Sequence, residues 1–123
     1  MEAGYRELSR DAMPKHSNDR LQGTLDLMVL KTLASRGPMH GFAITQHIEG
    51  AAAGALRLPE GSLYPALHRM MHAGWLKSDW KASENGRRAR YYTITAAGRR
   101  QLAEEQQNWA QLTAAVSRVL KLA

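Results

Sequence analysis

The chain has 123 residues, and its 17 Lys and Arg residues against 11 Asp and Glu residues give a formal net charge of +6 at pH 7. This length excludes two independent cores, and the positive excess favours an anionic partner: nucleic acid, anionic lipid or an acidic protein. The absence of cysteine excludes a disulfide-stapled secreted scaffold, a cysteine zinc site and thiol catalysis. Because no stretch resembles a signal peptide or a membrane span, we expect a cytoplasmic protein without a membrane partner.

The chain begins with a polar segment, residues 1–18, that we treat as an N-terminal extension. Tyr5, Leu8 and Ala12 are spaced as one side of a short helix, which Pro14 would end. The segment is therefore expected to form an extra helix that packs on the rest of the protein.

Two helices are predicted after this extension. Residues 21–35 are densely apolar and stop before Gly37, which is typical of a central core helix, and Asp19 with Gln22 resembles a capping box at its start. Residues 40–49 show a second helical spacing of apolar side chains. A connector of small residues follows.

A third helix is predicted from Glu60 to about Ala73. Its apolar residues fall at helical spacing on one face, which Leu63 and Leu67 begin. The opposite face is polar and carries no acid, so it suits an anionic partner. That outward face contains Gly61, Ser62, Pro65, His68, Arg69 and His72, with Tyr64 on its flank.

A β-hairpin is predicted next. Residues 75–83 and 88–95 are strand-like, and Asn85-Gly86 between them is a strong hairpin signal. Residues 75–100 hold seven basic and two acidic side chains, so five of the six net charges fall there. Such a run is often only a solvated face.

The expected register of this hairpin gives the basic run more meaning. With a two-residue loop, Lys81 would face Arg90, and Trp80 would face Tyr91. Like charges across a ladder destabilise it unless an anion lies between them. This register favours a functional role for the charges.

The last predicted element is a helix of some 25 residues, for which Thr95 is an N-cap candidate. Its apolar residues have an a/d-like spacing, and a small domain cannot bury such a stripe completely, so we expect it to meet a second copy in a dimer. The alternative is a helix that docks within its own chain. The stripe consists of Leu102, Trp109, Leu112, Val116 and Val119.

The predicted order gives a mainly α protein with a small β-hairpin. Residues 19–98 form a winged helix-turn-helix domain, in which the third helix can enter a major groove while the hairpin follows the backbone. Residues 99–123 form the dimerisation helix.

Five blocks of this sequence carry a recognisable pattern: GTLDL at 23–27, HGFAI at 40–44, GSLYPAL at 61–67, GWL at 74–76 and RYYTITAAG at 90–98. In their order and spacing, these blocks strongly resemble the PadR family of transcriptional regulators. The resemblance implies a winged-helix homodimer that binds an inverted-repeat operator, usually represses a gene, and is released by a small molecule in some cases. The single C-terminal helix is similar to the short-tailed branch of the family, while Phe42 departs from the common tyrosine.

We expect the DNA contacts to come from the third helix and the hairpin. Tyr64 and Pro65 stand where the family's recognition helix begins, and Arg69 can bind a phosphate or a guanine edge. The alternatives are a packing role for Tyr64 and a solvated Arg69. The predicted DNA-binding residues are Ser62, Tyr64, Pro65, His68, Arg69, Lys81, Arg87, Arg88 and Arg90.

Nothing in the sequence favours catalysis. His68 and His72 have a metal-compatible spacing but no third ligand nearby, and His40 is better explained as a cap or packing residue. We expect no enzyme activity, cofactor or metal.

Trp109 is the candidate for an effector site. On a dimerising helix it is an anchor, and in PadR-like dimers the corresponding aromatic can line a cavity where a small aromatic or hydrophobic molecule stacks. Two other functions stay open: a winged-helix module that binds an acidic protein, and a small-molecule-binding protein whose DNA affinity is incidental.

Overall fold

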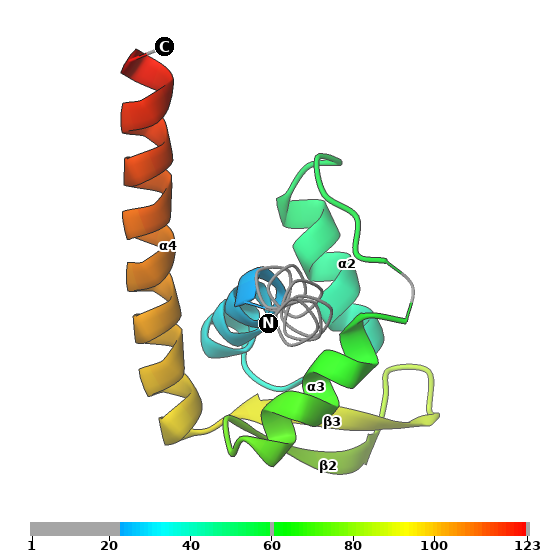
Figure 1. Ribbon diagram of the computed structural model, residues 1–123. Helices are drawn as coiled ribbons and strands as arrows, with labels where there is room; N and C mark the ends of the chain where they lie inside the picture. The colour runs from blue at the N-terminus through cyan, green and yellow to red at the C-terminus, as the bar shows by residue number, and fades with distance from the viewer. Residues whose placement is uncertain (1–22, 60, 123) are drawn as a thin grey trace, which may run out of the picture.

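The computed structural model describes residues 23–59 and 61–122. It confirms the mainly α class, with a first helix seen over residues 23–36. The predicted N-terminal helix and the Asp19–Gln22 cap lie outside the described residues. The other elements are β1 (Met39–His40), α2 (Gly41–Ala51), α3 (Leu63–His72), β2 (Leu76–Ala82), β3 (Arg88–Ile94) and α4 (Ala96–Leu122) (Figure 1).

Side chains cap two of these helices where the sequence indicates. The Ala43 N–H donates to His40 Nδ1 at 3.2 Å, so the predicted capping role of His40 is confirmed. Thr95 Oγ1 accepts from the Gly98 N–H at 3.0 Å and donates to the Gly74 carbonyl at 2.6 Å. Thr95 therefore starts α4 and ties it to the turn after α3.

The sheet has three antiparallel strands in the order β1-β3-β2. The hairpin forms two of them, and β1 adds the pairs Met39 with Tyr92 and His40 with Tyr91. Sequence patterning missed β1, because two residues are too few to show alternation. This short strand holds the start of α2 against the hairpin.

The hairpin loop contains one residue more than expected. The Ser83 N–H donates to the Arg87 carbonyl at 2.6 Å, which leaves three residues, 84–86, in the loop. Gly86 has φ +84°, as the last position of such a loop requires. Asn85-Gly86 thus marks the right turn but not its length.

The extra residue shifts the ladder, so the predicted register is wrong. Lys81 lies opposite Ala89 rather than Arg90, and Trp80 lies opposite Arg90 rather than Tyr91. The like-charge conflict inferred from the sequence does not exist. The basic side chains must be judged by their own surroundings.

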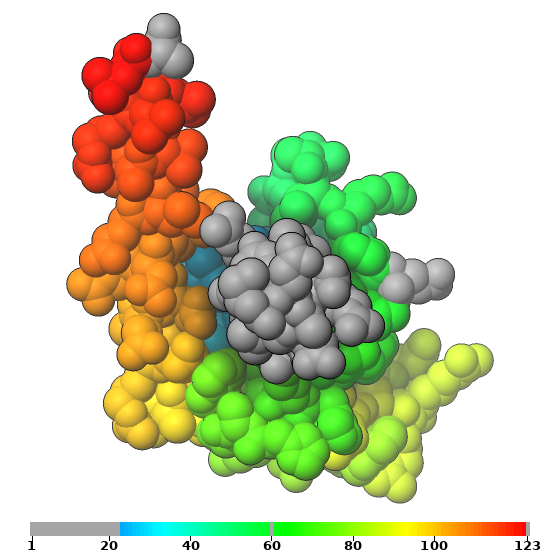
Figure 2. All heavy atoms as spheres, viewed as in Figure 1, coloured from blue at the N-terminus to red at the C-terminus, as the bar shows by residue number. Residues whose placement is uncertain are grey.

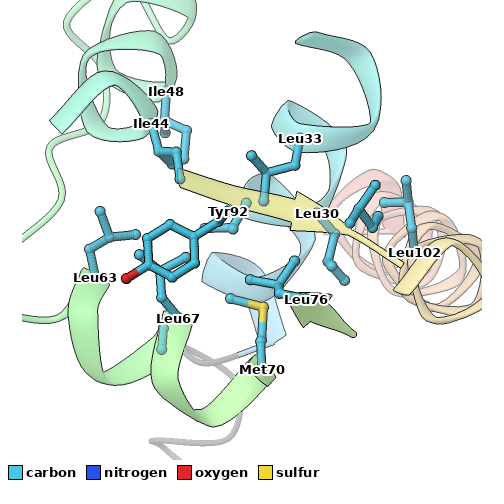
Figure 3. Close-up of a cluster of buried hydrophobic side chains, with 13 residues drawn as sticks. Leu30, Leu33, Ile44, Ile48, Leu63, Leu67, Met70, Leu76, Tyr92 and Leu102 are labelled. Atoms are coloured by element: carbon cyan, nitrogen blue, oxygen red, sulfur yellow. The ribbon is translucent and has the colours of Figure 1, made fainter. Parts of the chain in front are cut away.

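The core lies between the first helix, α2, α3 and the sheet (Figure 3). Its most completely buried side chains come from three helices, and Tyr92 places its ring among them from β3. Leu102, at the base of α4, is 7% exposed in this core, so its assignment to the dimer surface was wrong. The fully buried set is Leu30, Leu33, Ile44, Leu67, Met70 and Val29.

Only the base of α4 packs into the core. The helix leaves the sheet and extends along one side, and its last turns reach past the other described elements (Figures 1 and 2). Trp109, Leu112, Val116 and Val119 are 47%, 50%, 47% and 64% exposed. Among residues 23–59 and 61–122, the expected stripe is therefore largely unpartnered beyond Leu102.

Candidate nucleic-acid interface

A groove of about 760 Å³ lies between the starts of α2 and α3 and the β2–β3 hairpin, which we call the wing. The tip of the wing lies beside the beginning of α3 (Figure 1). Aromatic and basic side chains line the groove together. They include Phe42, Tyr64, Trp80, Arg87, Arg88 and Arg90.

Tyr64 occupies the second position of α3 and is 58% exposed. A β carbon at Gly41 would lie 2.7 Å from Cε1 and Cζ of Tyr64, closer than such contacts allow, so the ring rests against the bare backbone at the start of α2. Glycine at this position is what permits the approach. Tyr64 is thus held at the groove with its surface open to a ligand.

The basic side chains of the wing lie over aromatic rings. The Arg88 and Arg90 guanidinium carbons are 5.6 and 5.9 Å from the centre of the Trp80 ring, and Lys81 Nζ is 5.4 Å from that of Tyr91. Arg90 Nε also donates to Ser78 Oγ at 2.9 Å. These contacts order the cations without neutralising them.

No carboxylate in residues 23–59 or 61–122 pairs with Arg87, Arg88 or Arg90. Arg87 and Arg88 are exposed, and Arg90 is half-buried. Their charges are therefore available to phosphates, whose oxygens match the fork of a guanidinium.

The predicted residues of α3 fall into two sets. Tyr64 lines the wing groove, whereas Ser62, Pro65 and Arg69 line a depression of about 430 Å³ beside the first helix and the α2–α3 connection. His68 is exposed and lies between the two sets on the helix. Its ring meets that of His72 edge to face at 5.0 Å.

Two of these side chains are engaged inside the protein. The Ser62 hydroxyl donates to the Pro59 carbonyl at 2.8 Å. Arg69 does not face outward as expected: Nη1 and Nη2 donate to Oδ2 and Oδ1 of Asp26 at 2.8 and 2.9 Å. The helical wheel failed here because the acid lies 43 residues earlier in the chain.

Sequence reasoning missed two aromatic members of the groove. Phe42 is 64% exposed and Trp80 is 58% exposed. The signal for Phe42 was an aromatic directly after the Gly41 at the start of α2. Trp80 lies on the same face of β2 as the buried Leu76, but the core ends before it, so its ring is exposed.

A second apolar depression, of about 470 Å³, lies between the first helix, α2 and α4. Trp109 borders it from α4, and Leu27 and Met28 border it from the first helix. The side of Trp109 that faces its own chain thus has room beside it.

Two further features of the described residues concern membranes and metals. In the part of the chain that the structure describes, no helix is long and apolar enough to cross a membrane. Within the same residues, no three His, Asp or Glu side chains gather as metal ligands would.

The chain is similar to known proteins over most of its described length. It is 36% identical over 72 residues to a transcriptional regulator of Mycobacterium tuberculosis, covering 58% of this chain and 64% of that protein. The crystal structure of a PadR-like transcriptional regulator from Bacillus cereus superposes with a TM-score of 0.69 at 28% identity, covering 83% of this chain and 96% of the other.

A PadR family transcriptional regulator from Eggerthella lenta superposes with a TM-score of 0.68 at 27% identity, covering 94% of this chain and 99% of that one. The model of the PadR-like transcriptional regulator family matches residues 29–104, more than half of the chain. This protein therefore belongs to the PadR-like family of transcriptional regulators.

Proposed function

We propose that this protein represses transcription by binding an inverted-repeat DNA operator as a homodimer. The observation that carries the proposal is the wing groove, which the exposed Tyr64 of α3 lines together with arginines of the wing that pair with no carboxylate in the described residues. Phosphates attract such a surface whatever the base sequence. Recognition of sequence needs a helix as well, and α3 supplies it.

In this proposal the N-terminal half of α3 enters the major groove, which is wide enough for one helix. Tyr64, Pro65 and His68 lie on its exposed side. Arg87 and Arg88 hold the phosphate backbone beside it, which fixes the register without reading bases.

The second copy joins through the exposed part of α4. Two recognition helices then meet half-sites about 34 Å apart, so the operator has the two-fold symmetry of the protein. Repression follows when the occupied operator overlaps the site that RNA polymerase needs.

The test begins with duplexes that the wild-type protein selects from a random pool. Gel shifts then compare a selected duplex with one of its half-sites and with random DNA. We expect a symmetric consensus and binding at least about 1,000-fold tighter than to random DNA. Equal weak binding to every duplex would contradict the proposal and favour an acidic protein partner. A reporter gene behind the selected site should lose expression when the protein is present.

We also propose that a flat apolar molecule binds beside Trp109 and releases the operator. The support is the depression that Trp109 borders and the exposure of its indole. Protein carrying Trp75→Phe and Trp80→Phe, in which Trp109 is the only tryptophan, should show saturable quenching by some member of a panel of aromatic compounds. A panel without such a response would leave Trp109 as a dimer anchor.

A further inference from the structure

The ion pair between Arg69 and Asp26 joins the proposed recognition helix to the first helix. Both nitrogens of the guanidinium fork meet both oxygens of the carboxylate, at 2.8 and 2.9 Å. The Asp26 side chain is only 6% exposed, and that of Arg69 is 36% exposed. The pair therefore joins two helices through a buried carboxylate and differs from an exposed ion pair on the surface.

A buried carboxylate is costly unless its charge is matched in the right geometry. Arg69 supplies that geometry because its planar fork fixes distance and orientation together, which a lysine cannot do. Both terminal nitrogens of the fork thus donate to Asp26. A guanidinium that left the pair for a DNA phosphate would leave the carboxylate buried without its cation.

The pair acts on α3 at a useful place. Tyr64, five residues earlier on the same helix, is held against Gly41, and Arg69 fixes the middle of the helix to the first helix. The ion pair restrains the rotation of α3 about its axis, because it fixes one side of the helix to the first helix. The face that contains Tyr64 and His68 is thereby kept toward solvent.

We propose that Arg69 is a positioning residue for operator recognition: it holds α3 in its reading orientation through Asp26 and makes no contact with DNA. The proposal rests on the function proposed above. It differs from the expectation for an outward arginine, because its effect on DNA binding passes through a carboxylate inside the protein.

A double-mutant cycle tests this proposal. Asp26→Asn, Arg69→Gln and the double variant are titrated with a duplex selected by the wild-type protein and with random DNA, at several salt concentrations. We expect each single variant to lose about tenfold in operator affinity and the double variant to lose no more than either single one, because both substitutions break the same contact. Affinity for random DNA and the salt dependence should stay as in the wild type.

Arg69→Lys separates positioning from phosphate contact. It keeps the charge and loses the fork, so it should bind the operator as weakly as Arg69→Gln does. The proposal is overturned if Arg69→Lys restores operator affinity while Arg69→Gln lowers the salt slope by about one and weakens random DNA equally.

Thermal unfolding and circular dichroism guard against loss of folding. Should the variants unfold at lower temperature yet bind the operator fully when folded, the pair would be structural only and the proposal would fail. If the wild-type protein selects no sequence at all, the proposed function fails rather than the role of Arg69.

Discussion

Single residues in this fold are constrained most where backbones approach each other, and Gly98 is the clearest case. A β carbon there would overlap the Trp75 carbonyl oxygen and lie 2.7 Å from Cγ1 of Ile94. Thr95 caps α4 at the same place. The base of α4 can therefore sit close to the sheet only if residue 98 has no side chain.

Gly98→Ala should destabilise the protein by about 2 to 3 kcal/mol, because the obstacle is backbone and cannot move aside cheaply. For a domain of this size, that loss lowers Tm by roughly 10 °C at a fixed protein concentration. Gly50→Ala is the matched control: it lies in α2 with nothing within 4 Å of the added carbon, and should be neutral or stabilising. Equal Tm values for the two variants would contradict the close approach.

Tyr92 makes a prediction about alkaline pH. Burial raises the pKa of its hydroxyl above the ordinary 10.0, Arg90 opposes the shift, and Tyr64 adds to it. The folded state therefore holds this proton more tightly than the unfolded chain, so its contribution to stability is complete below about pH 10 and is lost as the pH rises through the folded-state pKa.

Denaturant unfolding of the wild type and Tyr92→Phe, from about pH 9 to about pH 11, checks this prediction. The wild type should lose more free energy of unfolding than the variant, since a phenylalanine ring at this position has no hydroxyl proton to lose. Parallel declines in the two proteins would show that Tyr92 is not the source of the alkaline loss.

Residue-scale predictions from the sequence succeeded where the partner is local. His40 caps a helix three residues away, and Thr95 does the same. Arg69 was misplaced because helical spacing reveals the face of a residue but not an acid elsewhere in the chain. The contact between Tyr64 and Gly41 was not predicted either, because helical spacing does not show a partner on another helix.

At the scale of elements, the wing shows what sequence patterns can and cannot decide. Asn85-Gly86 located the turn, but a glycine with positive φ suits loops of two and of three residues. The one-residue difference changed every cross-strand pair. It also placed Arg90 opposite Trp80, which brings its guanidinium and that of Arg88 to one ring.

The wing should supply salt-dependent, sequence-independent affinity. Replacing Arg87 and Arg88 together by alanine should weaken binding to operator and random DNA alike and lower the salt slope by about two, one unit for each lost phosphate contact. Arg118→Ala, on the exposed far part of α4, is the control and should leave the slope unchanged. An unchanged slope in the wing variant would remove the wing from the DNA interface.

At the scale of the whole molecule, the feature that most needs a partner is α4. Its apolar stripe beyond Leu102 stays exposed although the helix is 27 residues long. The sequence indicated this surplus through its a/d spacing, and it placed the helices of the described residues correctly because their periodicity is regular. The sequence did not show that Leu102 belongs to the core, because its burial depends on the point at which α4 leaves the sheet, and hydrophobic spacing does not reveal that point.

Val116→Glu should raise the dissociation constant of the proposed dimer at least about tenfold. Each copy would bury a carboxylate in the interface between the two α4 helices, at a cost above about 1.4 kcal/mol. Ala114→Glu adds the same charge on the other side of the helix and should leave the dimer intact. Sedimentation velocity over a range of concentrations measures both variants. A Val116→Glu protein that sediments as the wild type does would show that the dimer interface does not include Val116.

The length of α4 also makes it a lever. Twenty-seven residues at a rise of 1.5 Å give an arm of about 40 Å. If two such arms meet near their C-terminal ends in a dimer, a change of about 5° in the angle between them changes the separation of their bases, and so of the two α3 helices, by up to roughly 3.5 Å. That change is about a tenth of the half-site spacing. A molecule that spreads the two α4 helices by a few degrees would therefore move the two α3 helices away from the spacing of the half-sites.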